Sequence, residues 1–307
     1  MKGTEKKPAP SDACSILPTL EQVLLLRACL QSGQSGREAW EAWQSQRSNF
    51  HNGLETTEAL SGLRPLLLNA LRRNAVAADK TFLTYLRVAH LREEARTNIY
   101  RRICGRLLST LRAEGIQAIL LKGAALADTV YPSPVLRHCH DIDILLMDGD
   151  LQRAVRALSS QDFMPFDETP EPVIDDMKLV HRSGLPLELH SRLFRTPFYN
   201  ETLAGIWTRS QEQMIADVPS RILSPADNLL HVCVDAFYCE SRQSLRWVCD
   251  SWLIIDRYPN LDWNMLLDNA RDGDFAQPLS IILGYLAQEL NAAIPAAFLD
   301  RLYAAAP

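Results

Sequence analysis

Two aspartates, Asp141 and Asp143, have the residue type and spacing that most directly suggest catalysis. They alternate with an isoleucine and precede the apolar run 144–146, as expected for a β-strand, so both carboxylates should lie on one strand face. Their Cα atoms would then be about 6–7 Å apart. Paired oxygen ligands suit Mg²⁺, and divalent ions held in this way carry out phosphoryl and nucleotidyl transfer.

The spacing alone is weak evidence, because the chain also contains Asp-Gly-Asp at 148–150 and 272–274. Glycine indicates a turn at both places, where acids ordinarily stabilise the turn or cap a helix. Around Asp141 and Asp143 the strand is apolar, and two acids on one face of such a strand are otherwise unfavourable. A structural role and a metal-binding role therefore both remain open for this pair on its own.

A possible phosphate site lies upstream of the two acids. A strand expected at 117–121 leads directly into Lys122-Gly123 and then into a helix-like segment at 124–130. Glycine at such a turn lets the backbone approach a phosphate, while the helix N-terminus offers free N–H groups and a partial positive charge. Lys122 adds a full charge. The turn could therefore hold a phosphate group, and an ordinary turn is the alternative.

A third carboxylate follows downstream, in a segment at 178–190 that is expected to form a β-hairpin. Its second strand alternates polar and apolar residues, so Glu188 and His190 share the polar face. Glu188 could complete a cage of three carboxylates with the two aspartates. His190 would then orient the metal ligands or face the substrate. The alternative for this strand is a solvent-facing edge.

Histidines and arginines near the acids offer further possibilities. His138 and His140 directly precede the aspartates, and with His181 and His190 they could form a transition-metal cluster. Histidines in a loop beside Mg²⁺ ligands more often orient those ligands or bind phosphate, which is the interpretation that we favour. The arginines that are candidate phosphate contacts are Arg137, Arg192 and Arg246. For any one arginine, a surface ion pair is the alternative.

The elements that must position these residues divide the chain into four parts. Residues 1–14 are expected to be a disordered tail, since they are charged and proline-containing and have no apolar stretch. From 15 to 113, apolar residues recur every three or four positions, which predicts helices, the longest of them at 85–111. Strand and helix patterns alternate in a core placed at 114–222, and helices return at 223–307.

Composition excludes several classes of protein. The 307-residue chain is 47% apolar and 22% charged, which is ordinary for a globular protein and excludes bulk disorder. Its seven cysteines include no Cys-x-x-Cys pair, which argues against a disulfide scaffold and against a zinc site of the usual spacing. The formal net charge of −5 argues against general nucleic-acid binding. No secretory signal and no run of about 18 apolar residues is visible, so a cytoplasmic protein without a membrane partner is expected.

Taken together and in order, the motifs are fairly specific. They are Leu120-Leu121-Lys122-Gly123-Ala124-Ala125-Leu126, Tyr131-Pro132, Arg137, Asp141-Ile142-Asp143-Ile144-Leu145 and Leu187-Glu188-Leu189-His190. This series resembles the nucleotidyltransferase family of the polymerase-β-like superfamily. The helical segments 223–231 and 245–250 look like the continuation that these proteins share. The resemblance covers about 115–255 and reaches the N-terminal helices poorly.

The resemblance implies an α+β fold, with a small mixed β-sheet, helices on one side of it, and flanking N-terminal and C-terminal helical regions. The implied catalytic residues, which also bind Mg²⁺ or Mn²⁺, are Asp141, Asp143 and Glu188. In this family the third acid can also help to deprotonate the attacking hydroxyl. The implied contacts to the NTP are Lys122, Gly123, Arg137 and His190. The chain departs from the superfamily in having Ala124 where a serine is usual and in a longer gap before Asp141.

Three functional hypotheses follow. The first is an enzyme that moves an NMP group from an NTP to an unidentified acceptor, a small molecule, peptide or protein, with release of pyrophosphate. The second is a non-catalytic nucleotide-binding or scaffold protein that presents its helical region to a protein partner. The third, a sequence-blind RNA or DNA binder, is weaker, because the arginine pairs at 72–73 and 101–102 lie in helices that also carry acids.

Overall fold

The structure is a computed structural model of the chain, and it describes residues 16–46, 60, 62–166, 176–194, 205–238 and 244–306. The tail predicted at 1–14 lies outside the described residues. No helix in the described ranges is both long enough and apolar enough to cross a membrane.

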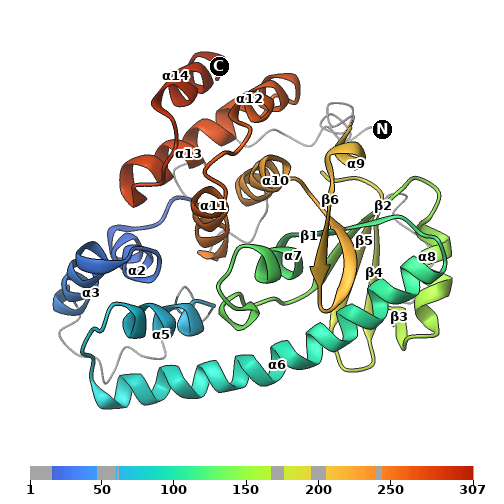
Figure 1. The fold of residues 1–307 in the computed structure, drawn as a ribbon, viewed down its shortest axis with the longest axis horizontal. Helices are drawn as coiled ribbons and strands as arrows, with labels where there is room; N and C mark the ends of the chain where they lie inside the picture. The colour runs from blue at the N-terminus through green and yellow to red at the C-terminus, as the bar shows by residue number, and fades with distance from the viewer. Residues whose placement is uncertain are drawn as a thin grey trace, which may run out of the picture.

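A seven-stranded mixed sheet lies in the right half of Figure 1, above the long helix α6 (Lys80–Ala113). Its strands follow the order β3-β4-β5-β2-β1-β7-β6. They are β1 (Ala118–Leu121), β2 (Ile142–Leu146), β3 (Phe163–Pro165), β4 (Asp176–His181), β5 (Pro186–His190), β6 (Gln211–Ile215) and β7 (Val218–Ile222). The predicted α+β class is confirmed, while β3, β6 and β7 are strands that the sequence pattern did not indicate.

The central strands have a register that matters for the site. β2 pairs antiparallel with β1 and parallel with β5, and β5 pairs antiparallel with β4 as the predicted hairpin. Asp143 lies opposite Leu121 on one side and opposite Glu188 on the other. Because β5 has a neighbour on both sides, the edge-strand alternative for Glu188 and His190 is wrong.

Two helices, α6 (Lys80–Ala113) and α8 (Leu151–Ser159), pack against one face of the sheet. The side chain of Asp79 caps α6 by accepting hydrogen bonds from the backbone N–H groups of Thr81 and Phe82. The C-terminal part of α6 buries Leu107 and other apolar residues in a cluster with Ile144 of β2 and Leu189 of β5. The N-terminal part of α6 extends beyond the sheet toward α5 (Figure 1).

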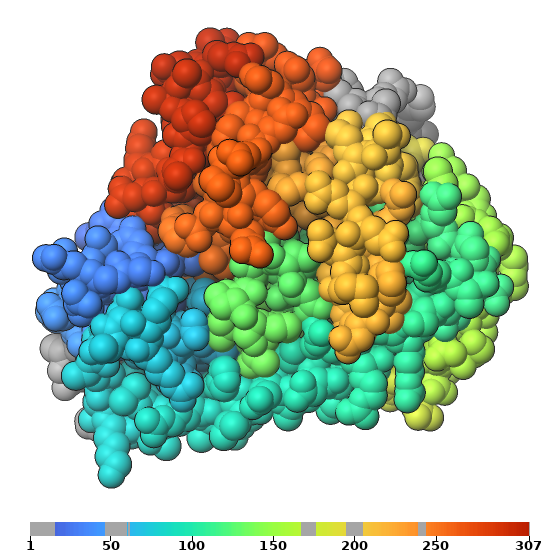
Figure 2. All heavy atoms as spheres, in the orientation of Figure 1, coloured from blue at the N-terminus to red at the C-terminus, as the bar shows by residue number. Residues whose placement is uncertain are grey.

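Helices from both ends of the chain form a second, larger core. The N-terminal helices are α2 (Leu20–Leu30), α3 (Gly33–Gln46) and α5 (Arg64–Arg73). The C-terminal helices are α10 (Pro225–Tyr238), α11 (Arg246–Arg257), α12 (Trp263–Asp272), α13 (Ala276–Leu290) and α14 (Ala296–Ala305). Figure 2 shows the blue N-terminal helices lying against the red and orange C-terminal ones. The same apolar cluster includes Ile119 and Leu145, on the opposite face of the sheet from α6.

Short elements connect the sheet to these helices. α7 (Lys122–Thr129) begins directly at the end of β1, two residues earlier than the predicted 124–130. The 3₁₀ turn η2 (Pro134–Leu136) leads from α7 to the loop before β2, and α9 (Ile206–Arg209) precedes β6. The loop between η2 and β2 carries the residues 137–141, so it decides how the acids meet the turn at α7.

Candidate active site

Three side chains on the two central parallel strands converge on one point. Asp143 of β2 and Glu188 and His190 of β5 each offer an oxygen or nitrogen atom, and these atoms all lie within 4.8 Å of one another. The Nε2 atom of His190 is 3.1 Å from Oδ1 of Asp143 and 3.8 Å from Oε2 of Glu188. Two carboxylates and an imidazole at this separation can share one divalent cation.

Strand pairing explains this convergence. In the parallel pair, Asp143 is opposite Glu188 and Leu145 is opposite His190, so Asp143, Glu188 and His190 all face the same side of the sheet. Asp143 and His190 are only 7% and 8% exposed, so each needs a partner to offset the loss of water. Glu188 is less buried, and its Oε1 atom also forms an ion pair of 2.9 Å with Lys178 on β4.

A further carboxylate, Asp176, supports His190 from the other side. Asp176 lies opposite His190 in the β4–β5 pair, and its Oδ1 atom is 2.9 Å from Nδ1 of His190. Burial lowers the pKa of His190, but the hydrogen bonds to Asp143 and Asp176 outweigh burial and raise this pKa to about 9. The sequence pattern did not single out Asp176. A hairpin centred on residue 183 does place positions 176 and 190 opposite each other, so this pairing could have been inferred from the register of the predicted hairpin.

Asp141 and Asp143 differ in their surroundings. Asp141 lies just before β2, and it is outside the group of donor atoms described above. Its pKa is raised by burial and by the charges of Asp143 and Glu188, so it lies close to both. For Asp143, burial raises the pKa, but the hydrogen bond from His190 and the charge of Lys122 together hold it below its usual range. The three predicted acids therefore do interact electrostatically.

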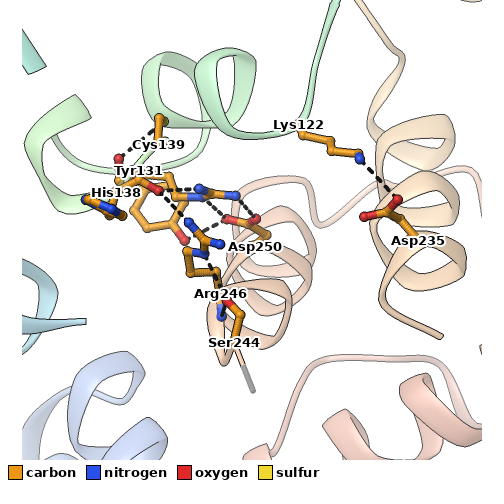
Figure 3. Close-up of polar contacts among 9 residues, drawn as sticks. Lys122, Tyr131, His138, Cys139, Asp235, Ser244, Arg246 and Asp250 are labelled. Atoms are coloured by element: carbon orange, nitrogen blue, oxygen red, sulfur yellow. Dashed lines mark hydrogen bonds and ion pairs between the residues drawn. The ribbon is translucent and has the colours of Figure 1, made fainter. Parts of the chain in front are cut away.

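Lys122 connects the turn to the acids. Its Nζ atom forms an ion pair of 3.0 Å with Asp235 on α10 (Figure 3). Burial lowers the pKa of Lys122, but the charges of Asp143 and Asp235 outweigh burial and raise this pKa above its usual value. The ammonium group therefore stays charged. Its φ angle of 43° is in the left-handed region, which is uncommon for a residue with a side chain. Asp235 was not indicated by the sequence pattern.

Gly123 lies in close contact with the loop before β2. A Cβ atom at this position would lie 3.1 Å from Nη1 of Arg137 and 3.2 Å from Sγ of Cys139. These distances are tighter than ordinary van der Waals contact. The glycine therefore lets the loop before β2 close onto the first turn of α7, beside Lys122.

Arg137, predicted to contact the nucleotide, has its guanidinium committed to Asp250 on α11. Nη2 is 2.7 Å from Oδ2 and Nε is 2.9 Å from Oδ1 of that carboxylate. Tyr131 donates a hydrogen bond of 2.7 Å to the same Oδ1 atom (Figure 3). Such a buried, two-pronged pair fixes the loop before β2 against the C-terminal helices.

Arg246, in contrast, has no carboxylate ion pair within the described parts of the chain. Its Nε atom is 2.9 Å from Oγ of Ser244, and its Nη1 atom is 3.5 Å from the carbonyl oxygen of His138 (Figure 3). Burial and the charge of Arg137 lower the pKa of Arg246, while the charges of Asp250 and then Asp141 raise it. The half-buried guanidinium of Arg246 is thus influenced by the charges of both Asp250 and Asp141, and it has donors beyond the two hydrogen bonds described. Arg192, the third predicted arginine, is exposed just after β5.

The four histidines do not form one cluster. His138 contacts Glu93 and Arg96 of α6, with its Nδ1 atom 2.7 Å from Oε2 of Glu93. Its Nε2 atom is 3.2 Å from Nδ1 of His140. Burial and then the charge of Arg246 lower the pKa of His140 to about 4, so this ring is neutral. Within the described residues, His190 is the histidine that belongs to the group of possible metal ligands.

The acids lie on adjacent strands of a mixed sheet, next to the strand-to-helix turn that contains Lys122 and Gly123. This is the arrangement expected of a nucleotidyltransferase. The chain belongs to the family described as "Uncharacterised nucleotidyltransferase", whose model matches residues 58–291. The predicted family is confirmed, and the chain is a nucleotidyltransferase by descent. The match also includes α5 and α6, which the motif resemblance reached poorly.

Comparison with solved structures gives distant similarities. The antibiotic-resistance factor ANT(2'')-Ia is 11% identical, with a TM-score of 0.41, over 63% of this chain and 95% of that one. An antigenic nucleotidyltransferase-like protein from Paracoccidioides brasiliensis is 16% identical, with a TM-score of 0.41, over 65% of this chain and 95% of that one. No curated protein matches the sequence of the chain.

Proposed function

We propose that the chain moves an NMP group from an NTP to an acceptor hydroxyl or phosphate and releases pyrophosphate, with a divalent metal ion as cofactor. The observation that carries this proposal is the convergence of Asp143 and Glu188 from adjacent parallel strands, with donor atoms within 4.8 Å of each other and of His190. Buried carboxylates rarely gather without a cation to offset their repulsion.

The donor set fits such a cation. Asp143 and Glu188 supply hard oxygen atoms, and Asp141 lies close enough for their charges to raise its pKa. When bound there, Mg²⁺ or Mn²⁺ would neutralise negative charge that develops on the transferred phosphate. Asp141, Asp143 and Glu188 remain our proposed metal-binding and catalytic residues.

Cationic groups flank the acids where the triphosphate would lie. Lys122 is held by Asp235 and faces Asp143, while Arg246 offers unused donors beside Asp141. We propose that these two side chains bind non-bridging phosphate oxygens, as charge-assisted hydrogen bonds do elsewhere. Gly123 shapes the turn, and Arg137 acts by holding the loop through Asp250. Arg246 thus replaces Arg137 in our assignment of direct phosphate contacts.

The proposed reaction follows from the placement of the acids and cations around the NTP. The acceptor oxygen attacks the α-phosphorus and forms a new P–O bond, and the bond from the α-phosphorus to the bridging oxygen breaks. Pyrophosphate leaves with the electron pair of that bond, and Glu188 takes the proton of the acceptor hydroxyl. The protein contributes orientation and charge, which are the main sources of catalysis in phosphoryl and nucleotidyl transfer.

The variant Asp143→Asn tests the proposal. We expect pyrophosphate release from each of the four NTPs, with Mg²⁺ or Mn²⁺, to fall to background, because a neutral amide holds a divalent ion far more weakly than a carboxylate does. Tm should change little. Asp148→Asn is the matched control, since Asp148 belongs to another Asp-x-Asp but is exposed in a turn. Mass spectrometry of the protein and of co-purified small molecules identifies the modified acceptor.

Turnover by Asp143→Asn at the wild-type rate would overturn the proposal. Tight NTP binding by the wild-type chain, without consumption across a panel of acceptors, would instead favour the non-catalytic nucleotide-binding or scaffold role.

A further inference from the structure

The central imidazole of the site is held from two sides. The Nδ1 atom of His190 is 2.9 Å from Oδ1 of Asp176, and its Nε2 atom is directed to Asp143 and Glu188. All four residues lie on three consecutive strands of the sheet, in the order β4, β5, β2. The His190 side chain is only 10% exposed, so it has little freedom to turn away.

This arrangement has the geometry of a carboxylate–histidine–metal triad. In such triads the carboxylate accepts a hydrogen bond from one ring nitrogen, which fixes the tautomer and aims the other nitrogen at the metal. Asp176 would do this from the strand opposite His190, through the register of the hairpin. Nε2 would then be a third ligand beside the oxygens of Asp143 and Glu188.

A nitrogen ligand changes which cation the site prefers. Mg²⁺ demands oxygen ligands in a near-ideal octahedron, whereas imidazole nitrogen favours divalent ions of the first transition row. A site made only of the three predicted aspartate and glutamate side chains would not discriminate in this way.

We propose that His190 is a direct metal ligand, oriented by Asp176, and that the site therefore binds Mn²⁺ and other first-row transition ions more tightly than Mg²⁺. This inference rests on the proposed function, because it concerns the same cation site. The competing role for His190 is that of a cation that neutralises Asp143 and is displaced when a metal binds. The two roles predict opposite effects of removing the imidazole.

Pulsed EPR on the purified full chain with Mn²⁺ alone distinguishes the roles directly. We expect a hyperfine coupling from a directly bound ¹⁴N nucleus in the wild-type protein, and we expect this coupling to disappear in His190→Asn. The wild-type spectrum is informative by itself, even if His190→Asn folds poorly. Absence of the ¹⁴N coupling from wild-type protein that has bound Mn²⁺ overturns the inference.

Calorimetric titration gives the second readout. We expect Mn²⁺ to bind more tightly than Mg²⁺, and we expect Asp176→Asn to weaken Mn²⁺ binding about 10–100-fold, since loss of a carboxylate behind a histidine ligand has effects of that size. His181→Asn is the matched control, because His181 is on the same strand as Asp176 but its Nδ1 atom contacts Ser183. Equal affinity for the two ions, or tighter Mn²⁺ binding by His190→Asn, also overturns the inference.

Failure of this inference differs from failure of the proposed function. If Mg²⁺ binds and supports NTP turnover while no ¹⁴N coupling is seen, the metal site stands and His190 is not a ligand. If neither ion binds and no NTP is consumed, both proposals fall.

Discussion

Arg137 and Arg246 both direct a guanidinium to the carbonyl oxygen of His138, but their remaining donors are used differently. Arg137 donates two hydrogen bonds, from Nε and Nη2, to the buried carboxylate of Asp250. Arg246 is hydrogen-bonded to a serine hydroxyl, forms no ion pair in the described ranges, and is influenced by the charges of Asp250 and Asp141. Two neighbouring arginines thus have separate duties, one in stability and one, as we propose, in phosphate binding.

Glutamine in place of each arginine should separate these duties. Arg137→Gln leaves Asp250 without its cation, so we expect a loss of about 3–5 kcal/mol in the free energy of unfolding. Arg246→Gln removes charge-assisted hydrogen bonds worth about 1.5–3 kcal/mol, so KM for the NTP should rise about 10–100-fold. Denaturant titration and steady-state kinetics on both variants measure these effects. The reverse pattern, with Arg137 controlling KM and Arg246 controlling stability, would show that the assignment is wrong.

Residues on one strand were predictable, and their distant partners were not. Alternation along a strand was enough to place Glu188 and His190 on one face, and the motif order placed that face toward Asp143. Asp235 and Asp250 are each 113 positions from the residue that they pair with. No local period connects such positions, because helix packing brings them together only in the folded chain.

At the scale of elements, the turn from β1 into α7 leaves little room for a larger side chain. Gly123→Ala adds a Cβ atom 3.1 Å from Arg137 and 3.2 Å from Cys139, so one of these side chains must shift. We expect a loss of about 1–3 kcal/mol in the free energy of unfolding, as is typical of overpacking. Because Lys122 is the preceding residue, the rate of pyrophosphate release should fall as well. Thermal unfolding and pyrophosphate assays check the two effects.

Gly62→Ala serves as the control for this turn. A Cβ atom there would lie 3.7 Å from the side chain of Arg246, which is an ordinary contact, and its φ is not in the left-handed region. The free energy of unfolding of Gly62→Ala should stay near that of the wild-type protein. If Gly123→Ala were as stable and as active as the wild type, the tight closure of the loop onto α7 would be contradicted.

Three strands were not predicted from the sequence, and each has a physical reason for being missed. β3 is three residues long, too short for alternation to be visible. β6 reads Gln-Glu-Gln-Met-Ile and exposes its first four side chains, so it lacks an apolar face. β7 contains Pro219, which argues against a strand in a sheet interior. Pairing with β1 and β6, not local propensity, makes β7 a strand.

At the scale of the whole molecule, the two ends of the chain depend on each other. Nε of Arg27 on α2 donates a hydrogen bond of 2.6 Å to the carbonyl oxygen of Glu289 near the end of α13. Gln31 and Trp252 both donate to the carbonyl oxygen of Leu290. The domain boundaries at 113/114 and 222/223 remain a prediction, but the large core joins the two helical regions across them.

Because the helices and the sheet share one core, a destabilising substitution far from the site should also reduce binding at the site. Trp40 on α3 is fully buried and stacks on Trp43 and Phe82, with ring centroids 5.1 and 5.7 Å away. Trp40→Ala should therefore cost about 3–5 kcal/mol in the free energy of unfolding. Because the core is continuous, NTP binding and far-UV circular dichroism should be lost together, at the same lowered denaturant concentration.

Leu20→Ala is the control: this side chain is 70% exposed, so both transitions should stay at the denaturant concentration of the wild-type protein. If Trp40→Ala lost its N-terminal helices first and still bound NTP, the helical region would be an independent domain, and the dependence between the two ends would be refuted.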